Sequence, residues 1–151
     1  LVYKPQEPLL FAGTVEDNVR AGNTTATADE VMRALAGAGM REAIHTGELS
    51  LAHEIAPFGN NLSGGQRQAI ALARALLSTA KIVLLDEPTS GFDIPTEQLV
   101  TQYLKTWTEG KTLILATHSP LLLTLLCDRL IVVNGGKIVA DGPRQQILKG
   151  S

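Results

Sequence analysis

Two short apolar runs, each followed by polar residues, constrain the fold of this chain more than any other feature. Ile82-Val83-Leu84-Leu85 ends in Asp86, and a second run at 112–116 is followed closely by His118. Strands that are buried on both faces of a parallel sheet have this continuous apolar character. Residues 96–107, between the two runs, have the spacing of a helix. Strands that alternate with helices predict an α/β fold.

The other segments are predicted from the same patterns. Helices are expected within residues 13–22, over 29–38, from Ser63 to about 78 and over 120–126, with loops at 23–27 and 45–61. Strands are expected near 1–3, before Pro5, and at 130–133, where Gly135-Gly136 predicts a hairpin with 137–140. The first part of the chain is therefore predicted to be rich in helix and loop.

Composition excludes several classes of protein. Of the 151 residues, 44% are hydrophobic and 19% charged, which is typical of a globular domain. The net charge of −2 lacks the basic excess of nucleic-acid-binding proteins, so no nucleic acid is expected as a partner. The leucine-rich stretch at 121–126 is far shorter than the roughly 20 residues of a membrane-spanning helix. The one cysteine, Cys127, favours a reducing compartment and is expected to pack in the core.

Two carboxylates stand at the end of the first apolar run, where α/β sheets bind their ligands. Asp86 is a candidate ligand of Mg²⁺, directly or through water, because hard cations prefer oxygen. Glu87 is a candidate for polarising a water that attacks a terminal phosphate. His118, one strand away, could hydrogen-bond that phosphate and orient the water. Taken singly, these residues also fit a solvated strand end and a structural histidine.

Ser63, Gly64 and Gly65 open a strongly patterned helix. Glycine lets a backbone approach a ligand closely, and the free N–H groups at a helix start favour a phosphate. The Ser63 hydroxyl could donate to an anion, or it could simply cap the helix. Gln6, after the first strand, could touch Mg²⁺ or water and so sense bound nucleotide.

Taken together, these residues resemble the ABC ATPase family over essentially the whole chain. Residues 62–68, LSGGQRQ, resemble the family signature, and residues 82–87 resemble its Walker B strand with the catalytic glutamate. Residues 90–93, SGFD, resemble the D-loop, which is usually SALD. His118 and Gln6 match the switch histidine and the Q-loop glutamine. The resemblance implies a partial RecA-like P-loop NTPase core, with a parallel sheet and flanking helices, joined to an α-helical subdomain.

The resemblance also implies a division of the chain and a set of roles. Residues 1–12 would hold a strand end and the Q-loop, 13–78 the helical subdomain with the signature, and 79–151 the C-terminal part of the RecA-like core. Two such ATPase domains pair head to tail, as a homodimer or heterodimer, and the signature of one closes over ATP held by the other. The implied catalytic residues are Glu87 and His118; those that bind ATP are Gln6, Ser63, Gly64, Gly65, Gln66 and Asp93; those that hold Mg²⁺ are Asp86 and Gln6.

Residues 4–15, KPQEPLLFAGTV, are similar to the Q-loop region of exporters, and 129–133 with 140–143 look like the end of type I secretion ATPases. This implies a motor that couples ATP hydrolysis to export of a protein, peptide or other substrate across the bacterial inner membrane. It would lie at the cytoplasmic face, with a transmembrane domain, a periplasmic adaptor and an outer-membrane channel as partners. Residues 9–11 could line a groove for a transmembrane-domain helix, or pack within the domain.

The chain departs from the family pattern in two places. No Walker A loop, GxxxxGK[ST], occurs in these residues, and because the chain opens on a strand end we expect the domain to begin upstream. Losing three hydrogen bonds to phosphate, at about 1.5–3 kcal/mol each, predicts that the isolated chain binds ATP negligibly and is inactive. Residues 56–59, APFG, stand where exporters carry Gly-Glu-x-Gly. A non-catalytic module that lends only its signature face to a partner is the alternative function.

Overall fold

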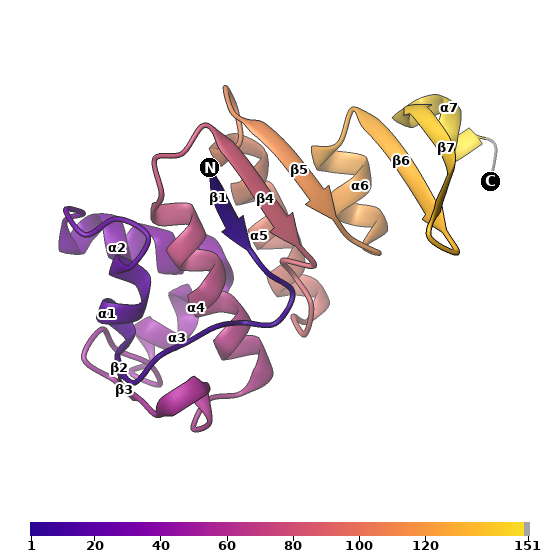
Figure 1. The fold of residues 1–151 in the computed structure, drawn as a ribbon. Coiled ribbons are helices and arrows are strands. Elements are labelled where there is room, and N and C mark those ends of the chain that lie inside the picture. Colours follow the sequence, from indigo (N-terminus) through magenta and orange to yellow (C-terminus); the bar gives the residue numbers. More distant parts are fainter. Residues whose placement is uncertain (150–151) are drawn as a thin grey trace.

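A three-stranded parallel sheet lies at the centre of the computed structural model, which describes residues 1–149 (Figure 1). The strands β1 (Val2–Lys4), β4 (Ile82–Asp86) and β5 (Thr112–Ala116) lie in the order β1-β4-β5. All three run in the same direction, and Asp86 pairs with Ala116. The predicted α/β fold is confirmed, and the carboxyl ends of the strands meet at one edge of the sheet.

Helices cover only one face of this sheet (Figure 1). They are α4 (Gly64–Leu77), α5 (Ile94–Trp107) and α6 (Pro120–Leu126). On the covered face Val83 and Leu85 are at most 1% exposed and join the main hydrophobic core. The exposed fractions on the opposite face are 55% for Tyr3, 43% for Ile82 and 56% for Ile114. The sheet therefore has a packed side and a bare side.

The segment before α4 is built from short elements. They are β2 (Gly13–Thr14), α1 (Val15–Arg20), α2 (Ala28–Leu35), the π-helical turn η1 (Ala36–Met40), α3 (Arg41–His45), β3 (Glu54–Ile55) and the 3₁₀ turn η2 (Pro57–Gly59). The helix predicted for 29–38 thus ends earlier as an α-helix and continues as a π-helix. The expected loop at 45–61 contains a strand, because β3 pairs antiparallel with β2.

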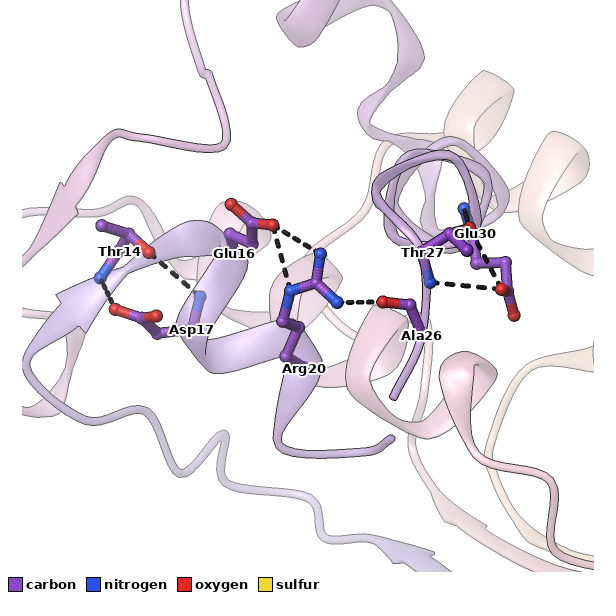
Figure 2. Close-up of polar contacts among 7 residues, drawn as sticks. All are labelled: Thr14, Glu16, Asp17, Arg20, Ala26, Thr27 and Glu30. Carbon is purple, nitrogen blue, oxygen red and sulfur yellow. Dashed lines mark hydrogen bonds and ion pairs between the residues drawn. The ribbon is translucent and has the colours of Figure 1, made fainter. Parts of the chain in front are cut away.

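Capping boxes start both α1 and α2 (Figure 2). The Thr14 hydroxyl accepts from Asp17 N and the Asp17 carboxylate accepts from Thr14 N, each at 3.0 Å. Thr27 and Glu30 repeat the arrangement at 3.2 Å. Each box satisfies two backbone N–H groups at the helix start, which explains why helices as short as these begin where they do.

Arg20 connects the two capped helices (Figure 2). Its guanidinium pairs with Glu16 at 2.7 Å and donates to the carbonyl of Ala26. The last turn of α1 is thereby tied to the residue that precedes the Thr27 cap. Val15, Val19, Val31 and Leu35, on the inner sides of the two helices, are fully buried.

The C-terminal part forms a separate hairpin beside α6 (Figure 1). Strands β6 (Arg129–Asn134) and β7 (Lys137–Pro143) pair antiparallel, as predicted, and α7 (Arg144–Lys149) follows. The last two residues of the predicted core segment 79–151 lie outside the described residues. Cys127, expected in the core, is half-buried, and its burial raises the pKa of the thiol. Within residues 1–149, no helix has the length and apolar character needed to cross a membrane.

Candidate functional site

The carboxyl ends of β4 and β5 bring the predicted catalytic residues together. His118 Nδ1 lies 2.5 Å from Glu87 Oε1, and the Thr117 hydroxyl donates to Glu87 Oε2 at 3.4 Å. The backbone N–H of Glu87 donates to the carbonyl of Ala116 at 2.8 Å, which extends the pairing of the two strands. The side chain of His118 is 99% exposed and that of Glu87 only 17%. A fixed carboxylate thus holds an imidazole that a ligand can reach.

Glu87 has a backbone conformation that few residues other than glycine adopt. Its φ is +45°, in the left-handed region. Such a conformation costs about 1–3 kcal/mol and is concentrated at functional sites, where neighbouring contacts hold it. Here the contacts to Ala116 and His118 do so. The sharp turn directs the Glu87 carboxylate to His118 immediately after Asp86 has ended the strand.

Asp86 and Gln6 follow neighbouring strands at the same edge of the sheet. Asp86 is the last residue of β4 and is half-buried, while Gln6 is exposed, two residues beyond β1. Proteins bind Mg²⁺ through one or two carboxylates together with water and substrate phosphates. Among the described residues, no group of three or more His, Cys, Asp or Glu side chains forms a metal cage. One carboxylate and one amide oxygen fit a Mg²⁺ ion whose other ligands are phosphates and water.

The start of α4 combines a cap with an accessible backbone. Ser63 Oγ accepts from Gln66 N at 3.1 Å, and Gln66 Oε1 accepts from Ser63 N at 3.0 Å. Gln66 Nε2 also donates to Glu48 at 3.2 Å. The capping role left open for Ser63 is therefore real. Ser63 is nevertheless exposed, and a side chain added at Gly64 would meet only the Arg67 guanidinium at 3.9 Å, so packing does not require glycine there.

The D-loop candidate lies against the tip of α4. A Cβ added to Gly65 would stand 3.5 Å from the carbonyl oxygen of Gly91, whose φ is +83°. Asp93 caps α5, because its carboxylate accepts from Thr96 N at 2.8 Å, and hydrogen bonds from the side chain and the backbone of Thr96 lower the pKa of Asp93. The structure thus brings residues 90–93 to the signature helix, while the Asp93 carboxylate holds the helix that follows.

The sequence left open whether residues 9–11 pack within the domain or line a groove on its surface, and the structure places these residues in both positions. Leu10 is buried, whereas Leu9 and Phe11 are exposed. The backbone of Phe11 is held by Asn18, which accepts from Phe11 N at 3.0 Å and donates to its carbonyl at 2.9 Å. Arg74 lies over the Phe11 ring, 5.6 Å from its centroid. One residue of the run packs inside, and two form a rigidly held apolar surface.

Two residues that the sequence patterns do not single out stand out in the structure. Phe58, in the segment that departs from the exporter pattern, has a φ of +60° and is 76% exposed. Lys4 is only 2% exposed, and burial lowers its pKa to about 8, although Asp86, Glu87 and Glu7 favour its charged form. For Lys4, the only signal in the sequence was a lysine at the end of an otherwise apolar strand. For Phe58, the only signal in the sequence was an aromatic residue between Pro57 and Gly59.

Comparison with known proteins identifies the family of the chain. Residues 1–90 match the family described as ABC transporter. The chain is 42% identical over 143 residues to an ATP-dependent lipid A-core flippase of Neisseria gonorrhoeae, covering 95% of this chain and 23% of the flippase. It is 40% identical over 147 residues to a lactococcin transport/processing ATP-binding protein LcnC-like of Lactococcus lactis, covering 97% of this chain and 20% of that protein.

A solved structure, that of a bacterial Atm1-family ABC exporter with ATP bound, matches the fold with a TM-score of 0.87. The sequence identity is 28%, and the match covers 98% of this chain and 26% of that chain. The chain thus spans no more than about a quarter of the length of these relatives. Because the family match covers more than half of the chain and the relatives match nearly all of it, the chain belongs to the ABC transporter family.

Proposed function

We propose that this chain is part of the ATP-hydrolysing motor domain of an ABC exporter. The observation that carries the proposal is the pairing of Glu87 with His118 at 2.5 Å, directly after Asp86, at the carboxyl edge of a parallel sheet. A base, an orienting group and a metal-binding carboxylate at one edge are what phosphoryl transfer to water requires. A module that lent only its signature face would not need this arrangement, so the catalytic function is favoured over that alternative.

In the proposed reaction each group has one task. The Glu87 carboxylate accepts a proton from the attacking water. Its contact with His118 Nδ1 leaves Nε2 to face the terminal phosphate. Asp86 and Gln6 hold Mg²⁺, which neutralises charge on the phosphates. Gly64 and Gly65 present free N–H groups, and Ser63 its exposed hydroxyl, to nucleotide bound by a second ATPase domain.

The roles of the remaining segments follow from this assignment. Residues 1–12, 13–78 and 79–151 correspond to the Q-loop strand end, the helical subdomain and the C-terminal core, and Gln66 and Asp93 support the nucleotide interface. The exposed side chains of Leu9, Phe11 and Phe58 face a transmembrane domain. Gly59, the residue after Phe58, packs closely against Leu10, because a Cβ added there would lie 3.0 Å from the Leu10 side chain. The domain would then lie at the cytoplasmic face of the bacterial inner membrane.

The transported substrate is proposed to be a protein or peptide. The lactococcin relative supports this class, whereas the flippase relative is named for lipid A-core. A type I secretion assembly, with a periplasmic adaptor and an outer-membrane channel, is the corresponding arrangement. Stimulation of ATP hydrolysis by a peptide and not by lipid A would favour this class, and the opposite result would exclude it.

The proposed hydrolysis is tested by Glu87→Gln in the complete protein. Removing the base should lower the rate of phosphate release by about 10²–10⁴-fold, with nucleotide binding retained. Glu109→Gln, which changes an exposed glutamate in the turn after α5, is the matched control and should leave the rate unchanged. Equal rates for the wild-type protein and Glu87→Gln would show that Glu87 is not the base.

A further inference from the structure

Lys4 is a buried cation that the proposed reaction does not use. It is the last residue of β1, it pairs in register with Leu85, and its side chain lies on the packed face of the sheet. Its neighbours on that face, Val2, Val83 and Leu85, are apolar. Lysine is almost never fully buried unless it is paired, so this position needs a reason beyond filling space.

The contacts of Lys4 connect three segments of the candidate site. Its ammonium group donates to Gln68 Oε1 and, at 3.5 Å, to the backbone carbonyl of Asp86. Gln68 Nε2 in turn donates to the backbone carbonyl of Gln6 at 2.9 Å. Gln68 is itself buried, at 7% exposed. Strand β4, helix α4 and the segment after β1 are therefore joined through two buried side chains.

We propose that Lys4 is a positioning residue for the Mg²⁺ and nucleotide site, acting through Gln68 on Gln6. This inference rests on the proposed function. Gln68 belongs to the second turn of α4, the helix whose tip carries Ser63. When that tip moves to contact nucleotide on a second ATPase domain, Gln68 moves with it and carries the backbone of Gln6. Lys4 anchors this connection to the end of the strand that carries Asp86.

A purely structural lysine predicts different behaviour. Methionine has a similar length and would fill the same space against Val83 and Leu85 without a buried charge. Replacing both members of a buried polar pair by apolar residues is often neutral or stabilising, whereas replacing one leaves the other without a partner. If Lys4 and Gln68 only supported packing, the double variant Lys4→Met/Gln68→Met would therefore leave both stability and the Mg²⁺ site unchanged. If they position Gln6, the double variant keeps its stability while its Mg²⁺ dependence changes.

The test uses the complete protein and two variants, Lys4→Met and Gln68→Met, with their double variant. Residues that support metal ligands typically change metal affinity by ~10–100-fold when they are replaced. We expect each single variant to raise the Mg²⁺ concentration needed for half-maximal ATP hydrolysis about tenfold, with kcat changed less than about twofold. The double variant should equal the single variants and not multiply them, because both cut one connection.

A second measurement does not depend on activity. In nucleotide-free protein, hydrogen–deuterium exchange at the backbone amides of Gln6, Glu7 and Leu9 should rise in Lys4→Met, Gln68→Met and the double variant, while the thermal midpoint of the double variant stays near wild type. Lys105→Met, an exposed lysine on α5, is the matched control and should change neither measurement. If Lys4→Met fails to fold, Gln68→Met alone decides, because it cuts the link to Gln6 and leaves the contact between Lys4 and Asp86.

The outcomes separate this inference from the proposed function. If wild-type protein hydrolyses ATP but the Mg²⁺ dependence and the exchange of 5–9 are unchanged in the variants, Lys4 is not a positioning residue. Multiplied effects in the double variant would show that Lys4 does not act through Gln68. A wild-type protein without Glu87-dependent hydrolysis would overturn the proposed function itself.

Discussion

Residues 13–78 and residues 79–149 differ in how completely their apolar surfaces are buried. In the first region the apolar sides of α1, α2 and α4 close on one another, and Val19, Leu35 and Leu72 are fully buried. In the second region the sheet is covered on one face, while Ile114 on the other face and Val133 in the hairpin are more than half exposed. Parallel sheets normally have both faces covered. The packed face of the second region shares one core with the first region, and its other face is bare within the described residues.

The most completely buried residues and the candidate catalytic residues also lie in different regions. Glu87 and His118 stand at the open edge of the second region, where a ligand can reach them. Ser63, the exposed tip of α4, is the point at which the first region reaches this edge, through the approach of Gly65 to Gly91. The tip of α4 and the carboxyl edge of the sheet therefore meet at the candidate site.

The largest effect that tests this comparison is a core truncation. Leu72→Ala, in the closed region, should lower the free energy of unfolding by about 2–5 kcal/mol, because the cavity cannot be filled by neighbouring helices. Ile114→Ala, on the bare face, should cost less than about 1 kcal/mol in the 151-residue chain. Urea denaturation of both variants measures the difference. Similar losses would mean that the two regions are equally closed.

The same two variants, Leu72→Ala and Ile114→Ala, can also be compared in the complete protein. If other segments cover the bare face there, Ile114→Ala should become as costly as other buried isoleucine truncations, about 2–5 kcal/mol. Leu72→Ala should cost the same in both contexts, because its surroundings are complete within residues 13–78 and the helices beside them. An Ile114→Ala effect that does not grow would show that this face stays exposed to solvent.

A smaller change in the free energy of unfolding is expected from polar contacts, which also differ between the two regions. Asn18 is fully buried and bonds Phe11, the carbonyl of Thr14 and the guanidinium of Arg74, at 2.9–3.1 Å. Asn18→Ala should cost about 1–3 kcal/mol for each buried group left without a partner. The Arg129–Asp141 pair of the hairpin, although bidentate, is exposed, and Arg129→Ala should cost clearly less than Asn18→Ala, because exposed ion pairs contribute little to stability. Urea denaturation distinguishes them, and an equal loss would contradict the comparison.

Local patterns in the sequence predicted much of both regions. The apolar runs at 82–85 and 112–116 predicted β4 and β5, but the burial on both faces that such runs indicate is found on one face only within the described residues. Thr14 and Ser63 marked helix starts, since a hydroxyl that caps a helix acts within three residues. The meeting of Glu87 and His118 was also predictable, because parallel strands end at a common edge.

The features that the sequence did not predict depend on distant contacts. The pairing of β2 with β3 joins Gly13 to Ile55 and involves only two residues on each side, too few for a periodic pattern. The burial of Lys4 requires Gln68, 64 residues away. The left-handed conformation of Glu87 is held by Ala116 on the next strand. No local propensity encodes these contacts.

The smallest predicted effect concerns the cap of α2 and its dependence on pH. Hydrogen bonds from the backbone and hydroxyl of Thr27 lower the pKa of Glu30 below its ordinary value of 4.5. A carboxyl whose pKa is lowered by folding contributes stability above its unfolded pKa, and that contribution is lost as the pH falls through the folded value. The first region should therefore lose stability below about pH 4.5.

Glu30→Gln isolates this contribution, because glutamine keeps the capping box but cannot titrate. At pH 7 the variant should be slightly less stable than wild type, since a neutral amide accepts weaker hydrogen bonds from Thr27 than a carboxylate does. The two should converge as the pH falls through the folded pKa of Glu30, because Glu30 becomes protonated in the wild type. Thermal midpoints measured between pH 3 and 7 would show this convergence. Curves that stay parallel would mean that protonation of Glu30 does not change the stability of residues 13–78. The cap would then act through its geometry alone.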